Sequence, residues 1–211
     1  MVGLVEEVKG RVLAEGMNLV GITPVHRLQD APAGRCPTDI LPTAHCVIVT
    51  AVHVLDSVFD LPYTRYEYTN QFFVLNSMLN SMAFKLSRYL ESQGYRTIPI
   101  PAAYPRVNKE IFGILSHRHA AVQAGIGEMR TECQLACVRD CPVHAISEDG
   151  IVDKAKCLHY QEQIMPWSAV ELRCGVCIAS CPIGKRTWRI PAGSRSQKVL
   201  KMKERWTGAR W

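Results

Sequence analysis

The chain has 211 residues, of which 47% are hydrophobic, so it can bury the core of one globular domain with a small additional module. Its formal net charge of +6 arises beyond residue 184, where nine Lys and Arg side chains accompany a single acid, Glu204. No apolar run reaches the roughly 18–20 residues of a membrane span and no signal-peptide core is present, so we expect no membrane span and a reducing, cytoplasmic setting.

Helices and strands are predicted to alternate in the first part of the chain. Apolar residues recur at helical spacing over residues 3–16, and a short buried strand follows over 17–22. Residues 25–39 carry the Pro and Gly that are typical of a loop, and the β-branched stretch 45–55 predicts a central strand.

The predicted elements continue with the longest helix of the chain. Residues 62–70 form a polar, tyrosine-rich connection, and a helix follows over 71–93, with Gly94 as the C′ residue that ends it. A further strand is expected over 96–100 and a further helix over 108–124. This alternation predicts an α+β fold in which helices and a sheet form layers.

Residues 131–184 hold seven of the nine cysteines, most of them in two short runs. Bacterial ferredoxins bind each [4Fe–4S] cluster with C-x2-C-x2-C-x3-C-P, in which the fourth Cys ligates the other cluster. Short spacings allow one loop to wrap several thiolates around a cluster, and the proline fixes the direction in which the chain leaves. The spacing therefore predicts two [4Fe–4S] clusters. The runs are Cys133-x3-Cys137-x3-Cys141-Pro and Cys174-x2-Cys177-x3-Cys181-Pro.

The ferredoxin rule assigns all four ligands of one cluster. Cys174 and Cys177 of the second run share a cluster with Cys141, the terminal cysteine of the first run. Cys157, which lies between the two runs, supplies the fourth thiolate.

The other cluster lacks one ligand. It takes Cys181 from the second run together with Cys133 and Cys137, and the missing thiolate belongs near Arg130. The alternatives are a three-iron cluster, a ligand other than Cys, a distant Cys such as Cys36, and residues omitted from the sequence at this point.

Zinc and disulfide bonds are the rival interpretations of these cysteines. A zinc site of this kind would use two C-x2-C pairs, and Cys174 and Cys177 form the only such pair in the chain. Disulfide frameworks belong to secreted chains, and no feature of the sequence indicates export.

Four segments resemble the superfamily of epoxyqueuosine reductases and reductive dehalogenases. The resemblance implies a nitroreductase-like α/β core with a C-terminal two-[4Fe–4S] ferredoxin-like module. It also implies a corrinoid such as cobalamin on the core, reduced by electrons from the clusters. The segments are LPTAHCVIVTAVHV (41–54), SHRHAAVQAGIG (116–127), CQLACVRDCPVHAI (133–146) and the cysteine-containing stretch 156–184.

The chain departs from this superfamily in two places. Family members carry a further segment of the corrinoid pocket and sheet, whereas here Met129 and Arg130 lead directly into the first cysteine run. An omission of residues at this junction would explain both the missing segment and the missing ligand. The epoxyqueuosine enzymes also carry an acid in the segment that corresponds to 98–113; no Asp is present there, so their substrate is not carried over.

These features predict three parts: a cofactor or substrate domain over 1–130, a cluster module over 131–184 and a basic tail over 185–211. The first hypothesis is a reductase that passes electrons from a ferredoxin- or flavodoxin-type donor, through both clusters, to a corrinoid or to a small-molecule or tRNA substrate. The alternative is a non-enzymatic electron carrier or redox subunit. A third hypothesis, contact with nucleic acid, rests only on the basic tail and its tryptophans.

Tyrosines and glycines are further candidate site residues. A phenol keeps its proton at neutral pH, so a tyrosine can donate one, although loop packing is the structural alternative. Gly125 and Gly127 would let the backbone approach a corrinoid, and a simple helix stop explains them equally well. The tyrosine candidates are Tyr63, Tyr66, Tyr68 and Tyr104.

Two cysteines and two histidines complete the candidates. Cys46 lies in the predicted central strand and is expected to be a small buried hydrophobe, whereas Cys36 lies in a loop and is the better stand-in for the missing ligand. His117 and His119 are two residues apart and face different sides of a helix. We therefore expect a surface or core role for them and no shared metal.

Overall fold

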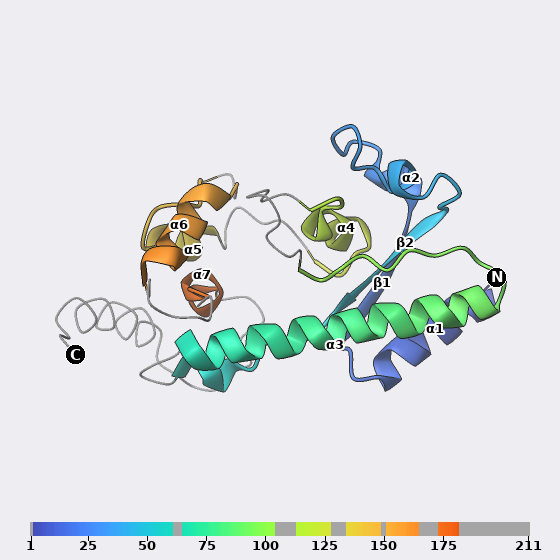
Figure 1. Ribbon diagram of the computed structural model, residues 1–211, viewed down its shortest axis with the longest axis horizontal. Coiled ribbons are helices and arrows are strands. Elements are labelled where there is room, and N and C mark those ends of the chain that lie inside the picture. The colour runs from blue at the N-terminus through green and yellow to red at the C-terminus, as the bar shows by residue number, and fades with distance from the viewer. Residues whose placement is uncertain are drawn as a thin grey trace. The chain divides into compact units, whose positions relative to one another are not determined.

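The chain divides into two compact units (Figure 1). Unit 1 comprises Met1–Val54 and Phe73–Met129, and unit 2 comprises Leu55–Phe72 and Arg130–Trp211. Unit 2 begins at the predicted boundary near residue 130, but it also includes the earlier segment Leu55–Phe72. The computed structural model describes residues 2–60, 65–103, 113–127, 134–148, 151–164 and 173–181.

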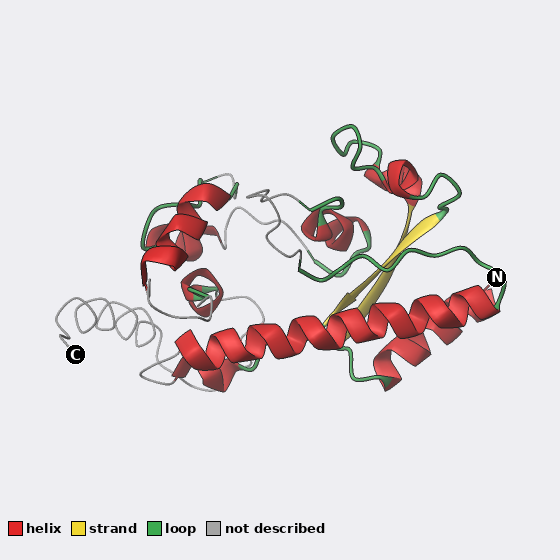
Figure 2. Cartoon of the chain, viewed as in Figure 1, coloured by secondary structure: helices red, strands yellow, loops and turns green. Residues whose placement is uncertain are grey.

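Unit 1 contains a small sheet and several helices, and the described part of unit 2 is mostly helical (Figure 2). No described helix is long and apolar enough to cross a membrane. The elements of unit 1 are α1 (Val2–Ala14), β1 (Leu19–Pro24), the 3-10 helix η1 (Val25–Leu28), α2 (Pro37–Ile40), β2 (Cys46–Ala51), most of α3 (Arg65–Ser92) and α4 (His117–Gln123). Those of unit 2 are the 3-10 helix η2 (Asp56–Asp60), the start of α3, α5 (Gln134–Asp140), α6 (Lys154–Ile164) and α7 (Val176–Ser180).

The sheet of unit 1 consists of β1 and β2, paired antiparallel. Alternate residues of a strand point to opposite faces. Val20 and Ile22 pack against the apolar core, whereas Gly21 and Thr23 are buried on the other face, where α4 contacts the strand. Both strands form close to their predicted positions, but in the described residues the sheet has two strands, so β2 is not the predicted central strand. Their register runs from Leu19 opposite Ala51 to Pro24 opposite Cys46.

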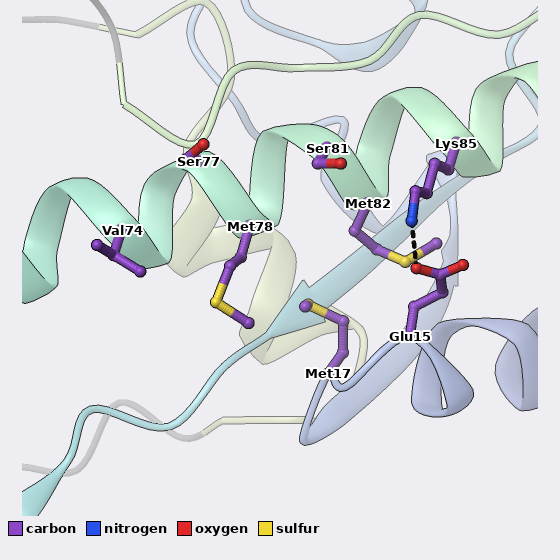
Figure 3. Close-up of a pocket in the computed structure, with 8 residues that line it drawn as sticks. All are labelled: Glu15, Met17, Val74, Ser77, Met78, Ser81, Met82 and Lys85. Carbon is purple, nitrogen blue, oxygen red and sulfur yellow. Dashed lines mark hydrogen bonds and ion pairs between the residues drawn. The ribbon is translucent and has the colours of Figure 1, made fainter.

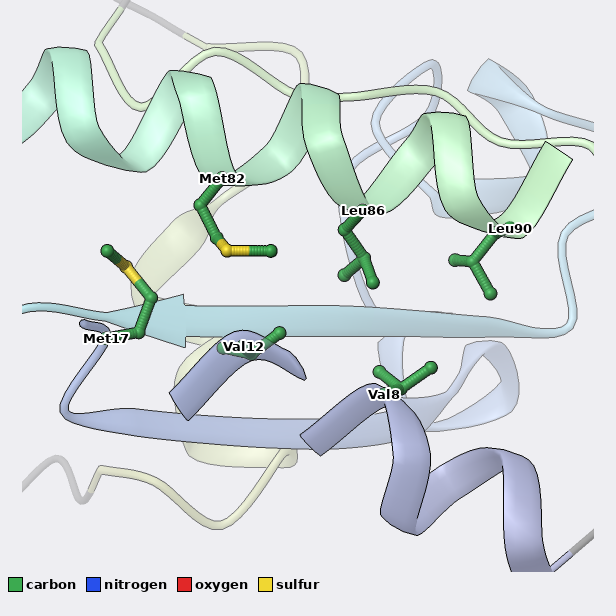
Figure 4. Packing of buried hydrophobic residues seen from close by; sticks show 6 residues of the cluster. All are labelled: Val8, Val12, Met17, Met82, Leu86 and Leu90. Atoms are coloured by element: carbon green, nitrogen blue, oxygen red, sulfur yellow. The ribbon is translucent and has the colours of Figure 1, made fainter. Parts of the chain in front are cut away.

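The apolar core lies between α1, α3 and the sheet (Figure 4). On each helix the buried residues recur every four positions, which places them on one face. This confirms the two amphipathic helices predicted from apolar spacing. The buried residues are Val8, Val12, Met17, Met82, Leu86 and Leu90.

α3 begins at Arg65, so the predicted connection over 62–70 is wrong from residue 65 onward. Tyr68 and Thr69, in the additional turns, are buried and contact a segment that follows much later in the sequence. Tertiary contacts, which override local propensity, thus favour a helix here. The other end is confirmed: Gly94, with a φ of 85°, is the C′ residue of α3.

No strand forms over 96–100, in contrast to the prediction. The segment instead makes hydrogen bonds to α3. The Thr97 hydroxyl donates to Ser87 O at 3.5 Å, and Ala102 N donates to Asn80 Oδ1 at 2.8 Å. Strand propensity depends on the surroundings, and here a helix supplies the partners.

α4 is shorter than the helix predicted over 108–124, because residues 113–116 are not helical. Ser116 is its N-cap, and its hydroxyl oxygen accepts a hydrogen bond from His119 N at 3.3 Å. The helix ends before Gly125, whose φ of 72° is that of a C′ glycine.

Candidate metal centre

The two cysteine runs fold in the same way. Cys137 lies within α5 and Cys141 directly follows that helix. Cys177 lies within α7 and Cys181 directly follows it. α5 and α7 contact each other, so the runs are neighbours although they are distant in sequence. Cys157, between them in the chain, lies on α6.

Cys177 has several other cysteines near it. Burial, followed by the charges of Cys174, Cys157, Cys141 and Cys137, raises the pKa of Cys177 to about 12. Because charges act most strongly at short range, these four side chains lie around Cys177.

Two of these sulfur atoms accept hydrogen bonds from nitrogen. Cys141, with 8% of its surface exposed, accepts one from Ala145 N at 3.2 Å. Cys157 accepts one from Gln161 Nε2 at 3.2 Å. Such bonds stabilise a thiolate, and hydrogen bonds to sulfur are one means by which proteins adjust the potential of an iron–sulfur cluster.

The side chains whose charges raise the pKa of Cys177 are all cysteines, and sulfur ligands favour zinc, Cu(I) or an iron–sulfur cluster over hard cations. Within the described residues, no three His, Cys, Asp or Glu side chains converge on a point suited to a single metal ion. A [4Fe–4S] cluster binds its thiolates at separate irons, so its ligands surround a larger volume. No disulfide links the described cysteines.

A tyrosine that the sequence did not assign to this centre lies beside the cysteines. The Tyr68 ring lies against Gly175, between Cys174 and Cys177, and only 8% of the tyrosine is exposed. Burial, followed by the charges of Cys177 and Cys174, raises the pKa of Tyr68 to about 12. The phenol is therefore neutral next to the candidate ligands.

Comparisons with family models, with curated protein sequences and with solved structures find no match to this chain. The resemblance to the epoxyqueuosine reductase superfamily therefore stays a prediction, as do the nitroreductase-like core and the corrinoid.

Some of the candidate site residues predicted from the sequence have another structural role, and others lie outside the described residues. Tyr66, one of the proton-donor candidates, is 50% exposed on α3. A Cβ on Gly127 would lie 4.0 Å from Ala121 Cβ, an ordinary contact, so packing does not require glycine there. Gly125 is explained by the end of α4. Outside the described residues are Cys133, Tyr63, Tyr104, the junction at Arg130 and the tail over 185–211.

The other candidate cysteines and histidines belong to unit 1. Cys46 is exposed at the first position of β2, so the prediction of a buried hydrophobe is wrong. The thiol of Cys36 donates to backbone carbonyls and desolvation raises its pKa, which makes it a poor thiolate ligand. His119 Nε2 lies 3.1 Å from Asp30 Oδ1, whereas His117 is exposed, in agreement with the prediction of separate roles.

Unit 1 carries a groove beside α3 (Figure 3). Its volume of about 380 Å³ is at the lower end of the roughly 300–1,000 Å³ typical of small-molecule sites. None of its described lining residues comes from 116–127, the segment predicted to approach a corrinoid. The groove is therefore sized for a small molecule. It is lined by Glu15, Met17, Val74, Ser77, Met78, Ser81, Met82 and Lys85.

Proposed function

We propose that the chain is an iron–sulfur oxidoreductase that transfers electrons through two [4Fe–4S] clusters. The observation that carries the proposal is the presence of four other cysteines near Cys177. One cluster would be held by Cys141, Cys157, Cys174 and Cys177, and the other by Cys133, Cys137, Cys181 and one further ligand.

Hydrogen bonds to sulfur support this assignment. The Ala145 N–H and the Gln161 amide would stabilise negative charge on the ligands Cys141 and Cys157. When bound, a [4Fe–4S] cluster supplies one-electron transfer. The chain's own residues would hold the ligands in place and keep water from them, as the burial of Cys141 indicates.

The resemblance to the epoxyqueuosine reductase superfamily implies which molecules exchange electrons with the clusters. A ferredoxin- or flavodoxin-type protein would donate electrons, and a corrinoid such as cobalamin, or a substrate bound to unit 1, would accept them. The groove beside α3 favours a small molecule over a tRNA, because the one cation in its described lining, Lys85, is paired with Glu15. The alternative is a non-enzymatic electron carrier.

Protein purified without oxygen should contain about eight iron and about eight acid-labile sulfide atoms per chain. Elemental analysis and sulfide assay measure both quantities. Cys46→Ser, which changes an exposed cysteine of β2, should retain the full content. Zinc in place of iron, or half the expected iron, would contradict the two-cluster proposal.

Cobalamin added to the reduced protein should bind and change its absorption spectrum, because the resemblance implies a corrinoid next to the clusters. The titration is done anaerobically with protein whose iron content has been measured, and free cobalamin serves as the reference. Full iron content without cobalamin binding would refute the corrinoid and favour the carrier alternative.

A further inference from the structure

The first turns of α3 cover the loop that carries Cys174 and leads into α7, the helix of Cys177. Gly175, in this loop, has a φ of 66°, and a Cβ there would lie 2.7 Å from Tyr68 Cδ1. The tyrosine ring thus occupies the space that a side chain would need. It also packs against Phe59, at 5.5 Å between ring centroids. These contacts hold the Tyr68 ring over the loop.

Arg173, the residue before Cys174, is held by the same helix. Its backbone N–H donates to Thr69 Oγ1 at 2.8 Å. Its guanidinium carbon lies 4.6 Å from the centroid of the Phe72 ring. An arginine keeps its charge in such an environment, and an aromatic ring attracts that charge. The residue that precedes a candidate cluster ligand therefore carries a permanent positive charge, anchored on the Phe72 ring.

We propose that Tyr68 and Arg173 set the reduction potential of the cluster at Cys174 and Cys177, with opposite effects. This inference rests on the proposed function. Both are positioning residues, since they act on the surroundings of the cluster and do not ligate it.

The opposite effects follow from the charge that reduction adds. Each electron makes a cluster more negative, and water stabilises that charge. The Tyr68 ring excludes water and so lowers the potential, whereas the Arg173 guanidinium attracts the added charge and so raises it. Tyr68→Ala should therefore raise the midpoint potential and Arg173→Met should lower it.

The test is an anaerobic potentiometric titration of the full-length, cluster-containing protein with dithionite, followed by electron paramagnetic resonance. We expect each substitution to change the equilibrium constant for reduction about tenfold, which is 59 mV for one electron. Tyr68→Phe keeps the ring and should keep the parent potential. Tyr95→Ala and Arg88→Met are matched controls, because they change exposed residues of unit 1.

Shifts of opposite sign would support the inference, whereas unchanged potentials or shifts of the same sign would overturn it. Absence of iron from the parent protein would instead refute the proposed function, and this inference with it. If Tyr68→Ala loses its cluster during purification, iron release to a chelator is compared between Tyr68→Leu and Tyr68→Phe. Faster release from the leucine variant supports a covering role for the ring, and equal rates overturn it.

Discussion

Cys141→Ser should remove about half of the iron and sulfide, or about four of about eight irons per chain. The lost cluster should be the one that the second cysteine run mainly builds. Cys141 directly follows α5, yet the exchange of terminal cysteines assigns it to Cys174 and Cys177. Iron and sulfide analysis of the anaerobically purified variant, with electron paramagnetic resonance of the reduced protein, measures the loss.

Double variants identify which cluster is lost. If Cys141 and Cys174 ligate the same cluster, their double serine variant should lose no more iron than either single variant. Cys141→Ser combined with Cys181→Ser should lose nearly all of the iron, because each substitution then damages a different cluster. Nearly complete loss of iron from the Cys141 and Cys174 double variant would instead mean that each run ligates its own cluster. Cys46→Ser again serves as the control for the loss of a cysteine.

Gly21→Ala should lower the free energy of unfolding by about 1–3 kcal/mol. A Cβ at this buried position would lie 2.6 Å from Ala124 O and 2.7 Å from Ile126 Cγ2. The first of these atoms is backbone, so the turn after α4 has to move away from β1. Chemical denaturation followed by circular dichroism measures the change.

Gly10→Ala is the matched control for this substitution. Gly10 lies within α1, is exposed, and has no atom within 4 Å of the place where a Cβ would be. Alanine there should stabilise the protein by up to about 1 kcal/mol, because it favours the helix. If Gly21→Ala were equally stabilising, the close packing of α4 on β1 would be wrong.

Regular spacing was enough to predict α1 and most of α3, whereas η1 and the start of α2 form within the predicted loop over 25–39. Val8 and Val12 on α1, like Leu86 on α3, belong to apolar series that a helix places on one face. The segment 96–100 could not be predicted in this way, because its partner on α3 is a backbone carbonyl, that of Ser87. A strand-like composition shows only that a segment can form a strand. The groups that surround it in the fold determine whether it does.

The cysteines of the candidate centre were open to prediction because ligand spacing is local. Cys174 and Cys177 are separated by two residues. The ferredoxin rule leaves one ligand of their cluster unassigned, and Cys157 is the cysteine between the two runs. All three lie close together in the structure. Tyr68 had no such pattern around it. Its contact with Gly175 joins two segments far apart in the chain, and no local rule relates them.

The hydrogen bond between Thr69 and Arg173 has a consequence for the order of folding, because it joins residues 104 positions apart. Closing so long a loop costs entropy before the contacts form, and distant contacts of this kind slow folding. During synthesis, the α3 turns emerge well before the loop that they cover. Until then, Tyr68 lacks its contact with Gly175 and Phe72 lacks its contact with Arg173. Apolar surface exposed in this way favours aggregation. We expect unit 2 to reach its native state only after residue 175 has left the ribosome.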